Sequence, residues 1–273
     1  MNDYEDAFFH TVGKDISQKT SIRSDHPYRV AIADGATESS FAAEWAGMLV
    51  HEFVNKPYTT VQEFQLRIQD LSRQWYLYLD TKELPWYAEE KMKTGAFSTI
   101  LGIELNVREK ISANTGSWSA FAIGDSCLFQ VRNDKLHYTF PVGNSQDFNN
   151  SPVLISSNPE RNTSVWSQIV FHTGEWKAGD EFYLLTDALA AWFMKEYEHG
   201  HQPWQKIMQF TEENENKEYF GKWIDLIRSN AQLKNDDVTC VIINVCSPKI
   251  YGLAAININK QYNNPLLFSL IRI

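Results

Sequence analysis

The sequence predicts an α+β fold, in which helices and antiparallel strands occupy separate stretches of the chain. Apolar residues recur at helical spacing before Gly95, and the period then changes to that of strands. Helical spacing returns over three later segments, and a last apolar strand follows them. The expected helices cover 38–53, 61–79, 187–197, 204–211 and 218–229. Strands that follow one another with short turns are typical of antiparallel pairing.

The first part of the chain alternates strands and helices. A strand is expected over 4–12, and a short apolar run, Val30 to Ala33, reads as a buried strand that breaks at Asp34-Gly35. Thr60 is a candidate N-cap for the helix over 61–79, because a glutamate follows it three residues later. Pro85 can open a further helix that ends near residue 93.

After Gly95 we expect a meander of antiparallel strands and then a long loop. The breaks between the strands contain charged residues, Gly-Asp or Asn-Asp. The loop over 141–164 is rich in Asn, Ser and Pro, and loops of this length in compact domains are often functional. The expected strands are 96–107, 117–123, 128–131, 136–140, 165–173, 181–186 and 238–245. Strand-like pieces at 250–256 and 266–273 have no assigned place.

Composition limits the classes of function. The chain has 273 residues, a formal net charge of −9 and a pI of about 5.3. No Lys/Arg run occurs, so neither a nucleic acid nor an anionic membrane is an expected partner. The cysteines of the apolar runs, Cys127 and Cys240, read as buried reduced thiols. We find no signal peptide and no apolar stretch of membrane-spanning length, which predicts a cytoplasmic protein.

Five acidic positions share one local context, the junction between a strand and a turn or helix. They are Glu5-Asp6, Asp34, Asp125, Asp187 and Asp236. Carboxylates gathered at one rim of a sheet repel one another unless a cation neutralises them. Oxygen-only ligation suits Mg²⁺ or Mn²⁺, and two such ions can hold a phosphate and activate a water.

Each position also has a purely structural interpretation. Asp34-Gly35, Asp125 and Asp236 can be turn or hairpin residues. Asp187 precedes a helical stretch and can be its N-cap. Glu5-Asp6 can be a solvated pair near the chain start. Each of these interpretations is reasonable alone, but all of them must hold together to exclude the metal-site hypothesis.

The order of these segments resembles that of the metal-dependent protein serine/threonine phosphatases of the 2C type. The resemblance covers residues 4 to 246 in unbroken order. The matching pieces are Glu5-Asp6-Ala7, Ile32-Ala33-Asp34-Gly35, Ala96-Phe97-Ser98-Thr99, Gly124-Asp125-Ser126, Leu184-Leu185-Thr186-Asp187-Ala188-Leu189 and Asp236-Asp237-Val238-Thr239.

The resemblance implies a four-layer α-β-β-α sandwich, with two antiparallel sheets flanked by helices and a binuclear Mn²⁺ or Mg²⁺ centre at one end. Asp34 would bridge the two ions, and the Gly35 carbonyl would bind one of them. Asp187 and Asp236 would hold the first ion. Glu5 would hold the second, with Asp6 behind it.

The same resemblance implies a third, weaker ion at Asp125 and Asp187, and a flap over 141–164 beside the cleft. The domain would span 1–246, with 247–273 as an extension of it. A metal-bridging hydroxide would attack phosphoserine or phosphothreonine directly, with Asp34, Asp187 and Asp236 as the catalytic carboxylates. The expected protein is a monomer that acts on a phosphorylated protein and opposes a Ser/Thr kinase.

Two departures from the family pattern leave an alternative open. The family often has an arginine where this chain has Met1, and some members have a histidine where it has Ala36. The arginine would grip the phosphate, and the histidine would protonate the leaving group. The alternative function is therefore a catalytically impaired scaffold or sensor that binds metal or a phosphoprotein.

Overall fold

The computed structural model describes residues 27–36, 39, 41–82, 92, 94–107, 114–149, 151–210, 216–245 and 266–272. For 107, 216–218 and 266–272 it describes the backbone alone. The strand expected over 4–12, most of the helix expected over 85–93 and the piece at 250–256 lie outside these ranges, as do Met1, Glu5 and Asp6.

Two antiparallel sheets form the centre of the molecule. The first has the order β1-β3-β4-β8 and the second the order β11-β10-β9-β5-β6. The first contains β1 (Tyr28–Ile32), β3 (Ile100–Val107), β4 (Thr115–Ile123) and β8 (Val170–Lys177). The second contains β5 (Cys127–Arg132), β6 (Lys135–Phe140), β9 (Glu181–Leu185), β10 (Thr239–Val245) and β11 (Leu266–Arg272). The strand-like piece at the chain end is thus an edge strand of the second sheet.

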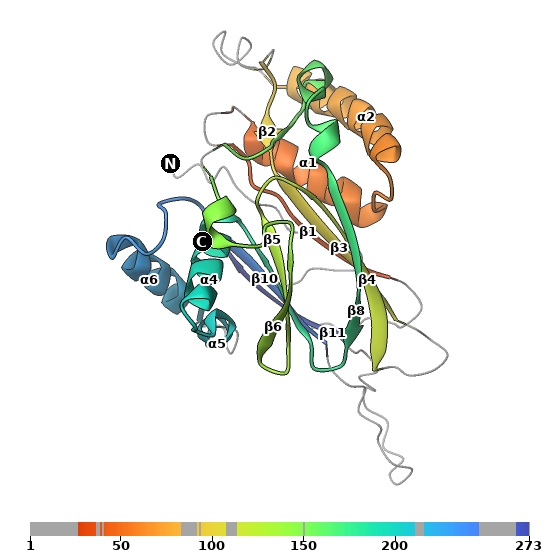
Figure 1. Cartoon of the computed structure of the whole chain (residues 1–273). Coiled ribbons are helices and arrows are strands. Elements are labelled where there is room, and N and C mark those ends of the chain that lie inside the picture. The colour runs from red at the N-terminus through yellow and green to blue at the C-terminus, as the bar shows by residue number, and fades with distance from the viewer. Residues whose placement is uncertain are drawn as a thin grey trace, which may run out of the picture.

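Helices cover the outer face of each sheet (Figure 1). The first sheet is covered by α1 (Ala42–Asn55) and α2 (Val61–Asp80), and the second by α4 (Asp187–Glu198), α5 (Pro203–Met208) and α6 (Asn216–Ser229). The Thr60 side chain accepts a hydrogen bond from the Glu63 amide at 3.1 Å, which confirms it as the N-cap of α2. The predicted α-β-β-α sandwich is therefore confirmed.

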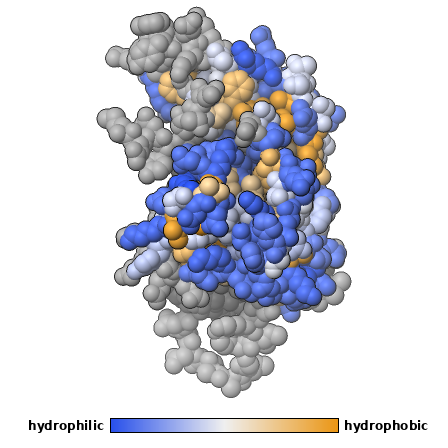
Figure 2. Space-filling view, turned by 60° about the vertical axis from the view of Figure 1, so that its left-hand side comes forward, coloured by the Kyte–Doolittle hydropathy of each residue, from blue (hydrophilic) through white to orange (hydrophobic). Residues whose placement is uncertain are grey.

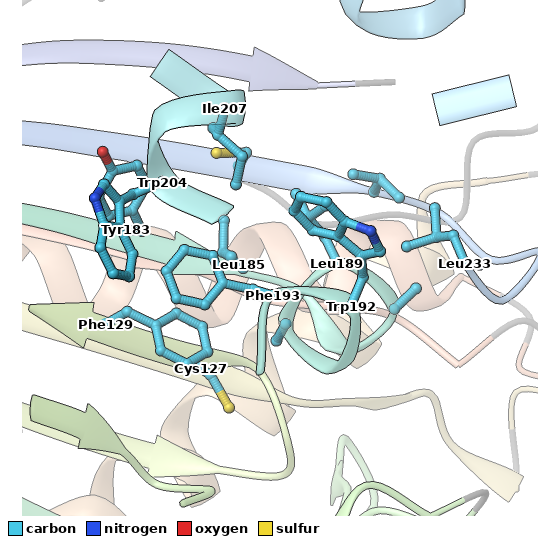
Figure 3. Close-up of a cluster of buried hydrophobic side chains, with 14 of the residues drawn as sticks. Cys127, Phe129, Tyr183, Leu185, Leu189, Trp192, Phe193, Trp204, Ile207 and Leu233 are labelled. Atoms are coloured by element: carbon cyan, nitrogen blue, oxygen red, sulfur yellow. The ribbon is translucent and has the colours of Figure 1, made fainter. Parts of the chain in front are cut away.

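Three apolar cores separate the four layers. Side chains such as Val30 of β1, Ile103 of β3 and Val241 of β10 fill the space between the sheets. The core under α4 includes Phe129 of β5 and Phe193 of α4, whose stacked rings have centroids 4.2 Å apart (Figure 3). The two cysteines of the apolar runs are buried free thiols in this same core, as predicted. This packing fixes the start of α4 against the end of β9.

The prediction of one continuous meander over 96–140 was wrong. The pairs β3–β4 and β5–β6 are hairpins, but β4 and β5 belong to different sheets. The chain crosses between the sheets at Gly124-Asp125-Ser126, where Gly124 has a φ of 96°. A period of two marks both faces of any strand equally, so it does not reveal which sheet a strand joins.

The long loop expected over 141–164 is partly ordered. It contains a 3₁₀ turn at Ser145–Asp147, the two-residue strand β7 (Ile155–Ser156) and a 3₁₀ turn at Pro159–Asn162. β7 pairs with β2 (Phe97–Ser98), and the Trp45 indole of α1 donates to the Ile155 carbonyl at 3.0 Å. The next strand begins at Val170, after a further 3₁₀ turn, rather than at residue 165.

The described surface is mainly hydrophilic on the face shown in Figure 2. This agrees with an acidic chain whose large aromatic residues are mostly buried. Among the described helices, none combines the length and apolar composition needed to cross a bilayer.

Candidate active site

The strand register brings four of the predicted acidic positions to one rim of the sandwich. In the first sheet, Ile32 pairs with Leu101 and Ile100 pairs with Ile123, so the end of β1 and the end of β4 share an edge. In the second sheet, Leu185 pairs with both Cys127 and Cys240, at the end of β9 and the starts of β5 and β10. The acidic residues that follow or precede these pairs are Asp34, Asp125, Asp187 and Asp236.

The turn that carries Asp34 is held by β2 and the residue after it. The Asp34 carbonyl accepts hydrogen bonds from the Thr99 amide and the Ser98 hydroxyl, both at 2.8 Å. The Asp34 amide in turn donates to Thr99 Oγ1 at 3.1 Å, and Gly35 forms a bridge with Ser98. Thr99 and Ser98 are therefore positioning residues for this turn, and the loose Ser-Thr match in the sequence was the signal for them.

Thr99 also ties this turn to the crossover that carries Asp125. Its hydroxyl lies 3.1 Å from the Ser126 hydroxyl. A Cβ on Gly124 would come within 2.5 Å of Thr99 Cγ2, and a positive φ adds strain for any other residue, so glycine is required there. The two sheets are joined at this point of the rim.

Asp125 is buried next to other carboxylates. Only 8% of its surface is exposed. Burial raises the pKa of Asp125 to about 7, and the negative charges of Asp187 and Asp236 act in the same direction. A carboxyl group with a pKa of about 7 is roughly half protonated at neutral pH, and a cation that comes closer would favour its charged form.

Asp187 is the first residue of α4, but it is not the cap. The N-cap is Thr186, whose hydroxyl accepts from the Thr239 amide at 2.9 Å, so the N-cap interpretation of Asp187 was wrong. Burial raises the pKa of Asp187, while Lys234 lowers it. Its Oδ1 atom is buried and has no hydrogen-bond partner. Such an atom is costly to bury, and a ligand that binds it would remove the cost.

Lys234 lies between the carboxylates of Asp187 and Asp236. Its Nζ atom is 2.8 Å from Asp236 Oδ2 and 3.3 Å from Asp187 Oδ2. Hydrogen bonding to Asp236, with the charge of Asp187, raises the pKa of Lys234. The lysine was missed in the sequence, although a basic residue two positions before the acidic pair was a visible signal.

A cavity of about 260 Å³ opens beside these carboxylates. Asp125 and Asp187 form part of its wall together with Lys234. Its other lining residues are Ser145, Phe148, Asn149, Ala188, Ala191, Trp192, Lys195 and Gln232. The loop after β6 and one side of α4 thus meet at the predicted site.

The donor groups fit a hard divalent cation in chemistry, although they form an incomplete set. In the described part of the chain, no group of three or more His, Cys, Asp or Glu residues is arranged to hold a metal. Asp187 and Asp236 nevertheless meet at one cationic group, and Asp187 has a buried oxygen without a partner. Carboxylate oxygens are the ligands that Mg²⁺ and Mn²⁺ prefer. The structure thus brings Asp125, Asp187 and Asp236 together, and Glu5 and Asp6 lie outside the described residues.

Comparisons with known proteins point to one family. A family model described as protein phosphatase 2C matches residues 11–227. No curated protein sequence matches significantly.

Solved structures with low sequence identity also match this chain. A C. elegans sex-determining protein is 12% identical, with a TM-score of 0.50 over 88% of this chain and 61% of that chain. The catalytic domain of the serine/threonine protein phosphatase PstP, in complex with two manganese ions, is 13% identical over 97% and 96% of the chains, with a TM-score of 0.45. The photosystem II phosphatase PBCP is 13% identical over 67% of this chain and 59% of its own, with a TM-score of 0.37.

Proposed function

Because the chain belongs to the protein phosphatase 2C family, we propose that it hydrolyses phosphoserine and phosphothreonine in a phosphorylated protein with Mn²⁺ or Mg²⁺ as cofactor. The main observation behind this proposal is that Asp187 and Asp236 both contact the ammonium group of Lys234, close to the buried Asp125. A rim that concentrates carboxylates in this way needs positive charge to stay assembled, and a phosphate ester needs positive charge to be attacked.

Several groups of the chain would hold the cations. Asp187 and Asp236 would hold the first, Asp34 would bridge to the second, and the Gly35 carbonyl would complete one ligand set, with Glu5, Asp6 and Asp125 as the remaining predicted ligands. Ions bound there would neutralise phosphate charge and lower the pKa of a water.

The rest of the site would position the ester. Ser98 and Thr99 form hydrogen bonds with the carbonyl and the amide of Asp34, so the backbone that bears its carboxylate is held in place. The packing of α4 on β5 and β9 fixes Asp187 in the same way. In the reaction a water oxygen bonds to phosphorus, the bond from phosphorus to the serine or threonine oxygen breaks, and that oxygen takes up a proton. Precise placement of this kind lowers the entropic part of the barrier.

This chain departs from the family pattern at the position of the proton donor. Ala36 stands where some members have a histidine, and its amide donates to the Phe97 carbonyl at 2.9 Å. Its methyl side chain carries no proton to give. In the proposed reaction the leaving oxygen is therefore protonated by water, which predicts slower turnover than in members with the histidine. The comparisons do not favour the alternative of an inactive scaffold.

Hydrolysis of a phosphoserine peptide by the metal-stripped chain tests the proposal. We expect Mn²⁺ to start phosphate release and excess chelator to stop it. Asp34→Ala should abolish the activity, because the bridging carboxylate is lost, whereas Asp70→Ala on the exposed face of α2 is the matched control and should not. Activity that persists in chelator or in Asp34→Ala contradicts the proposal. The flap role of 141–164, the opposing kinase and the monomeric state stay predictions.

A further inference from the structure

We propose that Lys234 is a tethered competitor for the metal: its ammonium group occupies the position between Asp187 and Asp236 until a divalent cation displaces it. This inference rests on the proposed function only in taking Asp187 and Asp236 as metal ligands. It adds a residue of this chain that would set the metal concentration at which the site fills.

The contacts of the lysine are those that a metal would need. Lys234 Nζ uses Oδ2 of Asp236 at 2.8 Å and Oδ2 of Asp187 at 3.3 Å. A divalent ion bound by the same two carboxylates would compete with the ammonium group for their oxygens. Its positive charge would also repel the ammonium group. The ammonium and the ion therefore exclude each other.

The ion pair leaves the site only partly satisfied. Asp187 Oδ1 stays buried without a hydrogen-bond partner while Oδ2 contacts the lysine. A structural ion pair in the same sheet looks different, because both oxygens of Asp180 accept hydrogen bonds from Arg132. The remaining oxygen of Asp187 is available to a metal and is not served by the lysine.

The lysine can also leave without disturbing the fold. The loop backbone is anchored by Leu233, which is buried in the core under α4 and whose amide donates to the Ile227 carbonyl at 3.2 Å. The Lys234 side chain itself is 52% exposed. A flexible four-carbon stem on a fixed backbone can swing into solvent, and an ion pair whose ammonium group is half exposed is partly screened by water. Displacement by a divalent ion is therefore feasible.

Calorimetric titration of Mn²⁺ into the metal-stripped full chain tests the inference. Lys234→Met should bind Mn²⁺ about tenfold more tightly than the wild type, because the competing charge and its two contacts with the carboxylates are lost. Lys234→Arg keeps a competitor and should stay close to the wild type. Lys195→Met is the matched control, since Lys195 lines the same cavity and the charge change is equal; its affinity should change by less than about threefold.

A second measurement uses the wild type and needs no variant. The rate of amine labelling at Lys234, mapped by mass spectrometry, should rise severalfold at saturating Mn²⁺, whereas the rate at Lys195 should not. Equal affinities of Lys234→Met and Lys195→Met, or an unchanged labelling rate at Lys234, would overturn the inference. Tight Mn²⁺ binding without phosphate release would contradict the proposed function and leave the inference standing.

Discussion

An aspartate lies near each end of β9, and the two differ in how many hydrogen bonds their carboxylates accept. Asp180, before the strand, is 1% exposed, and its carboxylate accepts from Arg132, from the Gln130 amide at 2.7 Å and from the Lys177 backbone amide at 2.8 Å. Asp187 follows the strand. Its Oδ2 atom accepts a hydrogen bond from Lys234 Nζ at 3.3 Å, and its Oδ1 atom is buried without a hydrogen-bond partner. The carboxylate before the strand thus has hydrogen-bond partners for both oxygens, whereas the carboxylate after it has a partner for only one.

The difference lies in the hydrogen bonds: the Asp180 carboxylate accepts a full set, whereas one oxygen of Asp187 accepts none. A buried carboxylate with a full set of donors stabilises the connection between β8 and β9, and its removal takes away the carboxylate partner of Arg132. A carboxylate with a buried oxygen and too few donors stores a cost that a ligand can relieve. We therefore expect substitutions at the two ends to differ in their effect on stability and on metal binding.

The largest effect on stability is expected at Asp180. Asp180→Ala should lower the free energy of unfolding by about 3–5 kcal/mol, since Arg132 loses its carboxylate partner and two further buried donors lose their acceptor. Urea denaturation of the metal-stripped protein measures this. The exposed Asp70→Ala is the control and should change the same quantity by less than about 0.5 kcal/mol. A loss below about 1 kcal/mol at Asp180 would remove the contrast between the two ends.

Asp125 should show the next largest effect, and its sign depends on pH. Its pKa is about 7 in the folded state, and it faces Asp187, Asp236 and Lys234. Below about pH 4 the carboxyl is protonated in both states and contributes nothing. Between about pH 4 and pH 7 the unfolded state loses the proton first, so the free energy of unfolding falls as pH rises.

Asp125→Asn removes this penalty. In excess chelator the variant should match the wild type near about pH 4 and be more stable by up to about 4 kcal/mol near about pH 8. Urea denaturation at both pH values measures the difference. If the free energies of unfolding of the variant and the wild type differ by the same amount at both pH values, Asp125 is not in a destabilising environment.

Asp187 should show the smallest effect on stability. In chelator, Asp187→Asn loses one long contact with Lys234 and is relieved of a partly buried charge, so the free energy of unfolding should change by about 1 kcal/mol or less. The same variant should lose most of the rise in melting temperature that Mn²⁺ produces in the wild type. If Asp187→Asn destabilises the metal-stripped protein as much as Asp180→Ala, then Asp187 is a structural residue.

Much of this architecture could be predicted from local patterns. The helical stripe ending near Leu79, the cap at Thr60 and the buried thiol at Cys127 depend on neighbours close in sequence, and all are confirmed. The strand-end positions of Asp34, Asp125 and Asp187 also follow from local breaks in periodicity. The family resemblance then supplied the order in which those ends meet.

What could not be predicted depends on contacts distant in sequence. The split of the meander at Asp125 is decided by which sheet completes the core, and a local period does not report that. The contact between Lys234 and Asp187 joins residues that lie 47 positions apart along the chain. The satisfied state of Asp180 likewise depends on Arg132, at a separation of 48 residues.

The most direct test of the account is the anomalous signal of a crystal of the full chain soaked in Mn²⁺. The account predicts a manganese peak about 2.1 Å from carboxylate oxygens of both Asp187 and Asp236, with the Lys234 side chain turned away from them. A crystal with manganese bound elsewhere, and with Lys234 still between the two carboxylates at saturating Mn²⁺, would contradict it.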